Sequence, residues 1–157
     1  MTAPAISGVI DAIIDRAEAV VPTIDPAQKF RRSDERAPFT TRGGKRIFDV
    51  NFEGHPRDLS NEGAGRQTVG QADRLARLTL DIEYPIGNAE KALETTIAVD
   101  SELLLRALAR SANWAGTSIT RATARSAVDR SESEAVDAAP GVLHLMVTID
   151  VQYVDLE

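Results

Sequence analysis

The chain has 157 residues, of which 43% are hydrophobic and 27% charged, with a net charge of −6 and no cysteine. This size indicates one domain that folds without a disulfide, and the missing cysteines exclude thiol nucleophiles and iron–sulfur clusters. The acidic balance disfavours general nucleic-acid binding, and no stretch approaches the roughly 20 apolar residues that would cross a membrane.

The first predicted element is an amphipathic helix over residues 6–21. Its apolar side chains form one stripe at helical spacing, and Asp11, Asp15 and Glu18 lie on the opposite side. Pro22 and Pro26 then end the helix and begin an extended segment.

A basic stretch follows at residues 29–46, where seven Lys or Arg side chains stand against two acids, a net charge of +5. Three interpretations remain open. The stretch is ordinary solvated surface, or half of an interface with a neighbouring acidic copy, or a nucleic-acid contact. The last is least favoured, because Phe30 and Phe39 are the only aromatic residues available for base stacking.

Gly43 and Gly44 predict a hairpin turn before a strand in which Phe48, Val50 and Phe52 alternate with polar residues. These glycines do not form a phosphate-binding loop, since the upstream glycine spacing and the hydroxyl residue after the lysine are missing. Residues 53–72 are rich in glycine and poor in apolar side chains, and we expect them to form a long mobile loop.

A long strand is predicted at residues 78–84, with alternate side chains buried and the acids Asp81 and Glu83 on a solvated face. Residues 88–110 have a helical pattern, and Asn88 suits its N-cap. Asp100 falls on the apolar side of this pattern. Either it is buried with a partner, or the helix breaks there and Asp100 caps a second helix; we favour the second interpretation.

A weaker strand at residues 119–128 and the clearest strand in the chain, at residues 143–153, predict a closing hairpin. The predicted fold class is therefore α+β. We expect a single domain over residues 1–157, in which an antiparallel or mixed sheet packs against the N-terminal amphipathic helix and a second, central helical segment.

No sequence pattern predicts a catalytic or metal-binding site. His55 and His144 lack the spacing of metal ligands, and no Gly-x-Ser-x-Gly elbow presents a serine nucleophile. The pair Asp81 and Glu83 is better explained as a solvated face than as an acid/base pair. We expect no catalytic, cofactor-binding or metal-binding residue, no cofactor, and a protein that is not an enzyme.

The order of elements resembles the tail terminator family of long-tailed bacteriophages. The resemblance lies in the N-terminal helix and in three segments, LTLDIEYP at residues 78–85, DSELL at 100–104 and LMVTIDVQY at 145–153. In that family a small α+β subunit forms a ring, usually a hexamer, that stops growth of the tail tube and presents a surface to the head connector.

The resemblance implies a structural virion protein without a catalytic motif, assembled in the host cytoplasm and located in the tail or neck. Its implied partners are further copies of itself, the tail-tube protein and a head–tail connector or neck protein, with DNA passing through the lumen without sequence-specific binding. Residues 53–72 and the extra residues between 85 and 100 depart from the family. They leave open another neck role, as a head-completion or connector-adaptor subunit, and a DNA-binding module is the least favoured alternative.

Local composition predicts contact residues at two places. The expected contacts are Arg42 and Lys45 at the hairpin tip, and Arg57, Asp58 and Arg66 in the long loop.

Overall fold

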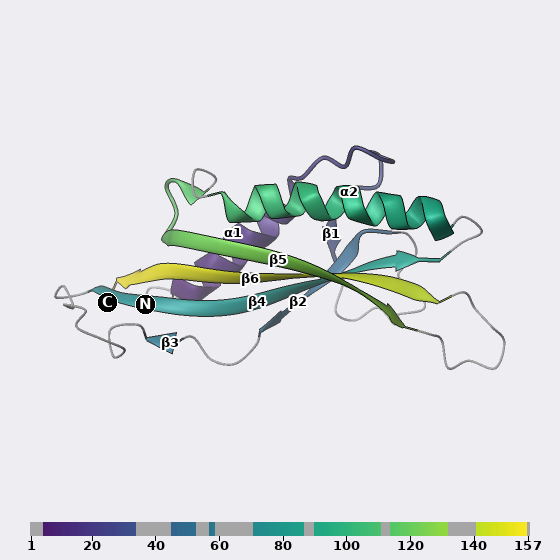
Figure 1. The fold of residues 1–157 in the computed structure, drawn as a ribbon. Coiled ribbons are helices and arrows are strands. Elements are labelled where there is room, and N and C mark those ends of the chain that lie inside the picture. The colour runs from purple at the N-terminus through teal and green to yellow at the C-terminus, as the bar shows by residue number, and fades with distance from the viewer. Residues whose placement is uncertain are drawn as a thin grey trace.

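The computed structural model of the chain describes residues 5–33, 45–52, 57–58, 71–86, 90–110, 114–131 and 141–156. Two helices, α1 (Ala5–Glu18) and α2 (Glu90–Ala109), lie on one face of a mixed β-sheet (Figure 1). The strands are β1 (Arg31–Arg32), β2 (Ile47–Phe52), β3 (Arg57–Asp58), β4 (Gln71–Pro85), β5 (Ile119–Ser131) and β6 (Val142–Leu156). The predicted α+β class is confirmed, with its mixed sheet, N-terminal helix and central helix.

The strand order is β1-β2-β4-β6-β5, and β3 pairs with β4 on the side that also pairs with β2. β1 runs parallel to β2, and the other described pairs are antiparallel. β4 and β6 pair along their whole length, from Gln71 opposite Leu156 to Pro85 opposite Val142. This long pair is the centre of the sheet, and β5 forms one of its edges.

Alternation along the central strands directs their apolar side chains to the helices. Leu78, Leu80 and Ile82 of β4 and Leu145 and Ile149 of β6 are each 0% exposed. We call this the helix-side face of the sheet. Burial of this face stabilises the fold, because apolar area removed from water contributes roughly 25 cal/mol per Å².

The helices meet this face with stripes of their own. On α1 the buried residues Val9, Ile13 and Ala17 recur every four residues, as the sequence pattern predicts. On α2 Leu104 and Leu108 are 0% exposed. No helix within the described residues is long and apolar enough to cross a membrane.

The predicted break at Asp100 is wrong, because α2 continues through it without interruption. Asp100 is buried at 0% exposure and has charged and polar partners on other elements. A buried carboxylate is tolerated where it is paired and hydrogen-bonded, so the helix has no need to end there. The other interpretation of this residue, burial with a partner, is the correct one.

Two further expectations fall largely outside the described residues. The predicted turn at Gly43 and Gly44 is one of them, and the strand that precedes it in the described part, β1, runs parallel to β2. The predicted loop at residues 53–72 is the other. Within it Arg57 and Asp58 pair with β4, and β4 itself begins at Gln71.

Candidate functional site

Among the predicted contact residues, Lys45 is the one whose side chain the structure describes. Its ammonium group donates to the Asp25 carboxylate, and this hydrogen bond holds the pKa of Asp25 below its usual range. The other predicted side chains lie outside the described residues: Arg42, Arg57, Asp58 and Arg66. The backbone of β3 pairs with β4 about 27 Å along the strand from the start of β2, so Lys45 and β3 do not share one site.

The basic stretch is only partly a surface feature. Arg46 is 0% exposed, and its guanidinium makes a two-point contact with Asp100, Nε to Oδ2 at 2.6 Å and Nη2 to Oδ1 at 3.1 Å. The remaining N–H groups donate to the backbone carbonyls of Ile24, Asp25 and Gln28. Each N–H of the guanidinium therefore has an acceptor, and Arg46, the residue directly before β2, joins the start of that strand to α2 and to the segment after α1.

Tyr84 completes this buried cluster, since its hydroxyl donates to Asp100 Oδ2 at 2.7 Å. The Arg46 guanidinium also lies 5.7 Å from the centre of the Phe30 ring, within the range of a cation–π contact. Breaking such a network leaves a charge unpaired in a low-dielectric interior. We therefore assign Arg46, Asp100 and Tyr84 to the architecture of the subunit.

The two tyrosines of the chain resist ionisation. Burial raises the pKa of Tyr84, and the neighbouring Asp100 carboxylate raises it further. Burial also raises the pKa of Tyr153. A raised pKa in the folded state means that the neutral phenol stabilises the fold below its unfolded pKa, and that this stability is lost as the pH rises above it.

We expect the free energy of unfolding to fall above about pH 10, the ordinary pKa of tyrosine, with Tyr84 contributing about 1.4 kcal/mol per pH unit. The substitution Tyr84→Phe removes this phenol, so the alkaline fall should be shallower in that variant. Urea unfolding of both proteins from about pH 8 to 11 measures the two slopes. Equal slopes would contradict the assignment, as would tyrosinate absorbance that develops near pH 10 while the protein is still folded.

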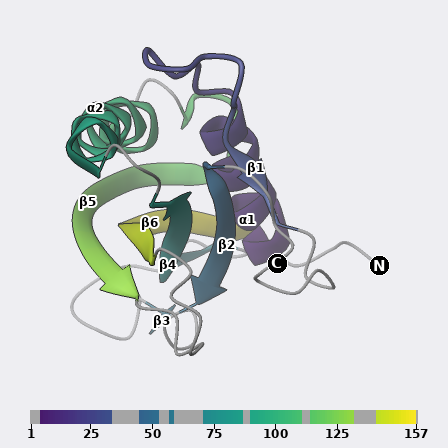
Figure 2. The ribbon, with the colours of Figure 1, turned by 90° about the vertical axis from the view of Figure 1, so that its right-hand side faces the viewer.

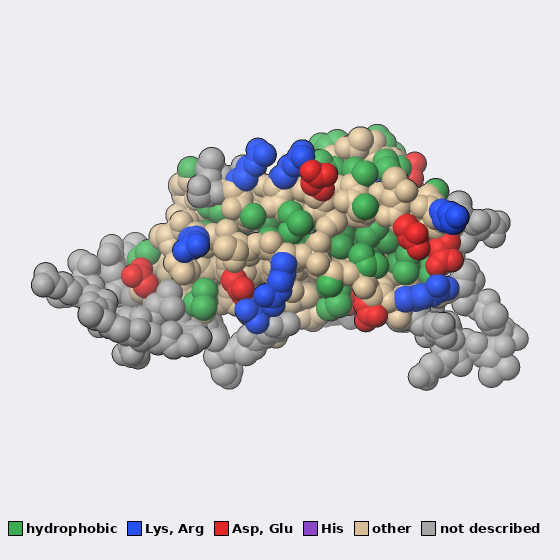
Figure 3. Space-filling model, in the orientation of Figure 1, with side chains coloured by type: hydrophobic (Ala, Val, Ile, Leu, Met, Phe, Trp, Pro, Cys, Tyr) green, Lys and Arg blue, Asp and Glu red, His purple; other side chains and the backbone are tan. Residues whose placement is uncertain are grey.

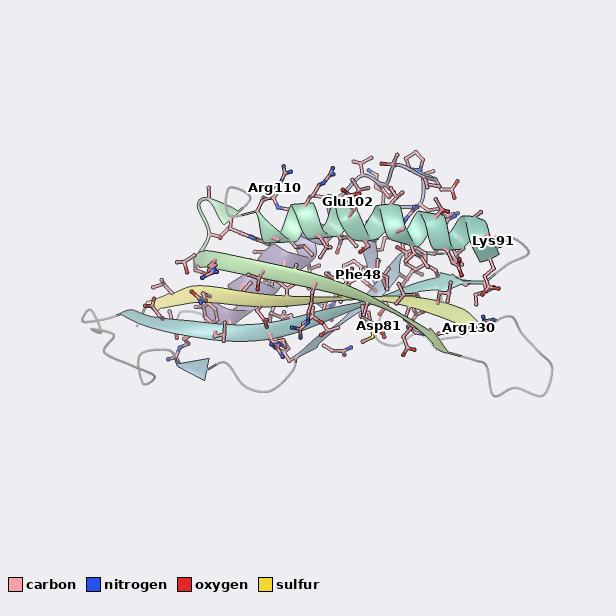
Figure 4. All side chains as sticks on the ribbon, viewed as in Figure 1. Phe48, Asp81, Lys91, Glu102, Arg110 and Arg130 are labelled. Carbon is pink, nitrogen blue, oxygen red and sulfur yellow. The ribbon has the colours of Figure 1, made fainter. Side chains whose placement is uncertain are left out.

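The second face of the sheet has no helix over it among the described residues, and we call it the helix-free face. It holds cross-strand polar pairs. His144 Nδ1 lies 2.7 Å from Asp81 Oδ1, and Arg77 Nε donates to Asp150 Oδ1 at 2.6 Å. Figure 4 shows Asp81 on this side of the sheet, and Phe48 on the helix side.

The prediction that both acids of β4 lie on a solvated face is only half right. The Asp81 side chain is 26% exposed, but Glu83 as a residue is only 6% exposed. Alternation gives the face on which a side chain lies and not what covers that face. No group of three or more potential metal ligands occurs among the described residues. The pair of His144 with Asp81 explains the histidine that the sequence leaves on the polar side of the last strand.

β5 is the edge strand that the structure leaves open. Over residues 119–131 its pairing partner is β6, and the described residues offer no partner on its other side. Most of its side chains are exposed, among them Arg121, Arg125 and Arg130, which stand against the single acid Asp129. An open edge is a template for pairing with another chain, so this strand is the first candidate for a contact surface.

A groove of about 490 Å³ lies between β5 and α2, and we call it the edge groove. It is lined by Glu94, Ile97, Ala98, Ser101 and Val128. Val128 is 57% exposed, one of the exposed large apolar side chains of the described structure. Figure 3 shows hydrophobic side chains gathered along the line between α2 and β5.

Polar contacts hold the two walls of this groove together. Arg130 Nη1 of β5 lies 2.9 Å from Glu90 Oε1 of α2, and the hydroxyls of Ser101 and Ser126 are 2.7 Å apart. Figure 4 shows Arg130 near the end of α2 that carries Lys91. The groove is therefore a fixed feature of the packing of α2 on β5.

The opposite flank of the molecule has different chemistry. Figure 2 shows β5 on one side of the sheet and α1, β1 and β2 on the other. The exposed side chains of α1 include Asp11, Asp15 and Glu18. Arg16, its one basic residue in this region, lies 5.8 Å from the ring centre of Trp114. The exposed face of α1 is thus acidic and the β5 edge is basic, although the exposed cations Lys29, Arg31 and Arg32 lie beside β2 on the same flank as α1.

No model of a known protein family matches this sequence. Comparison with curated proteins also gives no match.

Sequence reasoning missed both the open edge and the groove. The alternation at residues 119–128 predicts β5, but strand order depends on partners that are distant in sequence.

Proposed function

We propose that this chain is a structural, non-enzymatic subunit of a tailed bacteriophage, which forms a ring that ends the tail tube and joins the tail to the head connector. The work of such a protein is binding and geometry, without bond chemistry. Its partners are further copies of itself, the tail-tube protein and a neck protein, and DNA passes through the ring.

The observation that carries the proposal is the pairing of two unlike flanks on one chain. A ring requires a heterologous contact, in which one surface of a subunit binds a different surface of the next. The basic edge of β5 and the opposite flank of the sheet, which carries the acidic helix α1 and the strand β2, provide two such surfaces. Opposite charges across a contact orient the partners and discourage wrong pairings.

The element order supports the same proposal. The helix, the long strand ending at Pro85, the helix through Asp100 and the final strand follow one another as in the tail terminator family. The neighbouring neck roles, head completion and connector adaptation, need the same kind of subunit and remain the alternative.

The DNA-binding alternative rests on residues 29–46 and is weakened by two of their cations. Arg46 is buried against Asp100, and Lys45 is engaged by Asp25. Lys29, Arg31 and Arg32 keep exposed positions, but they are few for a phosphate-binding surface on an acidic protein.

We expect the purified full-length chain to form discrete rings, of six copies by the resemblance, alone or after addition of tail-tube protein. Mass photometry measures the number of copies, and negative-stain electron microscopy shows whether they close. A protein that stays monomeric at high concentration with tube protein present would contradict the proposal. Binding to duplex DNA that weakens steadily with added salt would favour the DNA-binding alternative.

A further inference from the structure

We propose that copies of this chain join edge to edge. In this contact β5 of one copy pairs in antiparallel fashion with β2 of the next, and Phe52 of the second copy packs beside Val128 and fills the edge groove. The proposal deepens the proposed function, on which it rests, by naming the contact that would build the ring.

Exposed apolar side chains at both edges of the sheet are the first observation. Phe52 on β2 is 44% exposed and Val128 on β5 is 57% exposed. Residues 49–52 of β2 pair with β4 on one side, and the described residues offer no strand partner on the other, since β1 pairs only with residues 47 and 48. Within the described residues both edges thus carry an exposed apolar side chain beside unpaired backbone, which is a template for pairing with another chain.

Both apolar side chains also lie on the same face of the sheet. Phe52 is the register partner of Leu78, and Val128 is the register partner of Leu145. Register partners in an antiparallel pair project to the same face, and both leucines are buried on the helix side. A sheet continued from β5 into the β2 of another copy therefore brings Phe52 and Val128 together on one face.

Strand direction is compatible with this continuation. β2 is antiparallel to β4, β4 to β6, and β6 to β5. β2 and β5 therefore run in opposite directions within one subunit. When a second copy continues the sheet with its helices on the same side, its β2 meets the first copy's β5 in the antiparallel sense, which pairs well through short, direct hydrogen bonds.

The edge groove can accommodate the Phe52 ring of the second copy. Its walls include Ile97 and Ala98 of α2 and Val128 of β5, so a phenylalanine arriving beside Val128 enters an apolar setting under α2. The Phe52 ring is half exposed in the single subunit and would be buried in this contact. Buried aromatic side chains of this kind contribute much of the binding energy of interfaces.

Cysteine cross-linking tests this contact directly, because the chain has no cysteine of its own. Within one subunit β2 and β5 are separated by β4 and β6, so residues on them lie at least about 14 Å apart and cannot form a disulfide. The variants are Phe52→Cys combined with Val128→Cys, and Phe52→Cys combined with Ser126→Cys, the next residue of β5 on the same face. We expect mild oxidation of the assembled protein to give covalent multimers in one or both.

The matched control is Phe52→Cys with Ala127→Cys, because Ala127 is exposed on the same strand but projects to the helix-free face. We expect no covalent multimers from it. A second measurement uses Val128→Glu, which places a charge in the groove. It should raise the protein concentration needed for assembly at least about tenfold, the effect of a 1.4 kcal/mol loss, while urea unfolding stays close to that of the parent protein.

The outcomes separate this inference from the proposed function. Normal rings in Val128→Glu, together with no cross-link in either cysteine pair, would overturn the edge contact and leave the ring function standing. Cross-linked open filaments would support the edge contact and contradict the ring. A monomer that gives no cross-link at any concentration would contradict both.

Discussion

Asp100→Ala should lower the free energy of unfolding by about 3–5 kcal/mol, because it leaves the guanidinium of Arg46 buried without its counter-charge. Both side chains are 0% exposed in the ion pair, so water cannot replace the lost carboxylate without opening the fold. The hydroxyl of Tyr84 loses its acceptor at the same time. Urea unfolding followed by circular dichroism measures the change.

Glu102→Ala is the matched control, since Glu102 lies on the same helix and forms an exposed pair with Arg106. Such surface pairs contribute about 0.3–0.5 kcal/mol. The double variant Arg46→Met with Asp100→Leu should be more stable than Asp100→Ala alone, because it removes both charges together. A loss below about 1 kcal/mol for Asp100→Ala would show that the buried pair is not the anchor described above.

Asp100 also shows where sequence reasoning reaches its limit. Its position on an apolar helical stripe is visible in the sequence, and it demands either a partner or a break. The partner, Arg46, lies 54 residues away and looks like one more cation of a basic surface stretch. The local pattern shows that Asp100 needs a partner, and only the fold shows that the partner is Arg46.

The helices and strands themselves were largely predictable, because each has a clear period. α1 and β6 have strict stripes, and the structure matches them within a few residues. The extension of β4 back to Gln71 was not predicted, since the residues before Leu78 break the alternation. That extension comes from pairing with β6, whose backbone continues to Leu156.

The candidate contact surface was much less predictable than the fold. Charge and glycine content directed attention to turns and loops, whereas the described structure places its open features at strand edges. Phe52 and Val128 each look like ordinary alternating residues in the sequence. Their exposure follows from the order β1-β2-β4-β6-β5, which sets β2 and β5 near opposite edges and which no local pattern contains.

The one-sided construction of the sheet predicts a sharp contrast between adjacent residues of β6. Ile149 is 0% exposed on the helix-side face, so Ile149→Ala should cost about 2–5 kcal/mol through lost burial and the cavity left behind. Thr148 lies on the helix-free face, where its hydroxyl is 3.4 Å from that of Thr79. Thr148→Ala should therefore cost less than about 1 kcal/mol.

Urea unfolding of the two variants under the same conditions measures this contrast, and unchanged m-values would show that the unfolded states are comparable. Similar losses at both positions would mean that the helix-free face is packed as tightly as the other. In that case the helix-free face would be covered at Thr148 as it is at Thr79 and Glu83, which are 3% and 6% exposed.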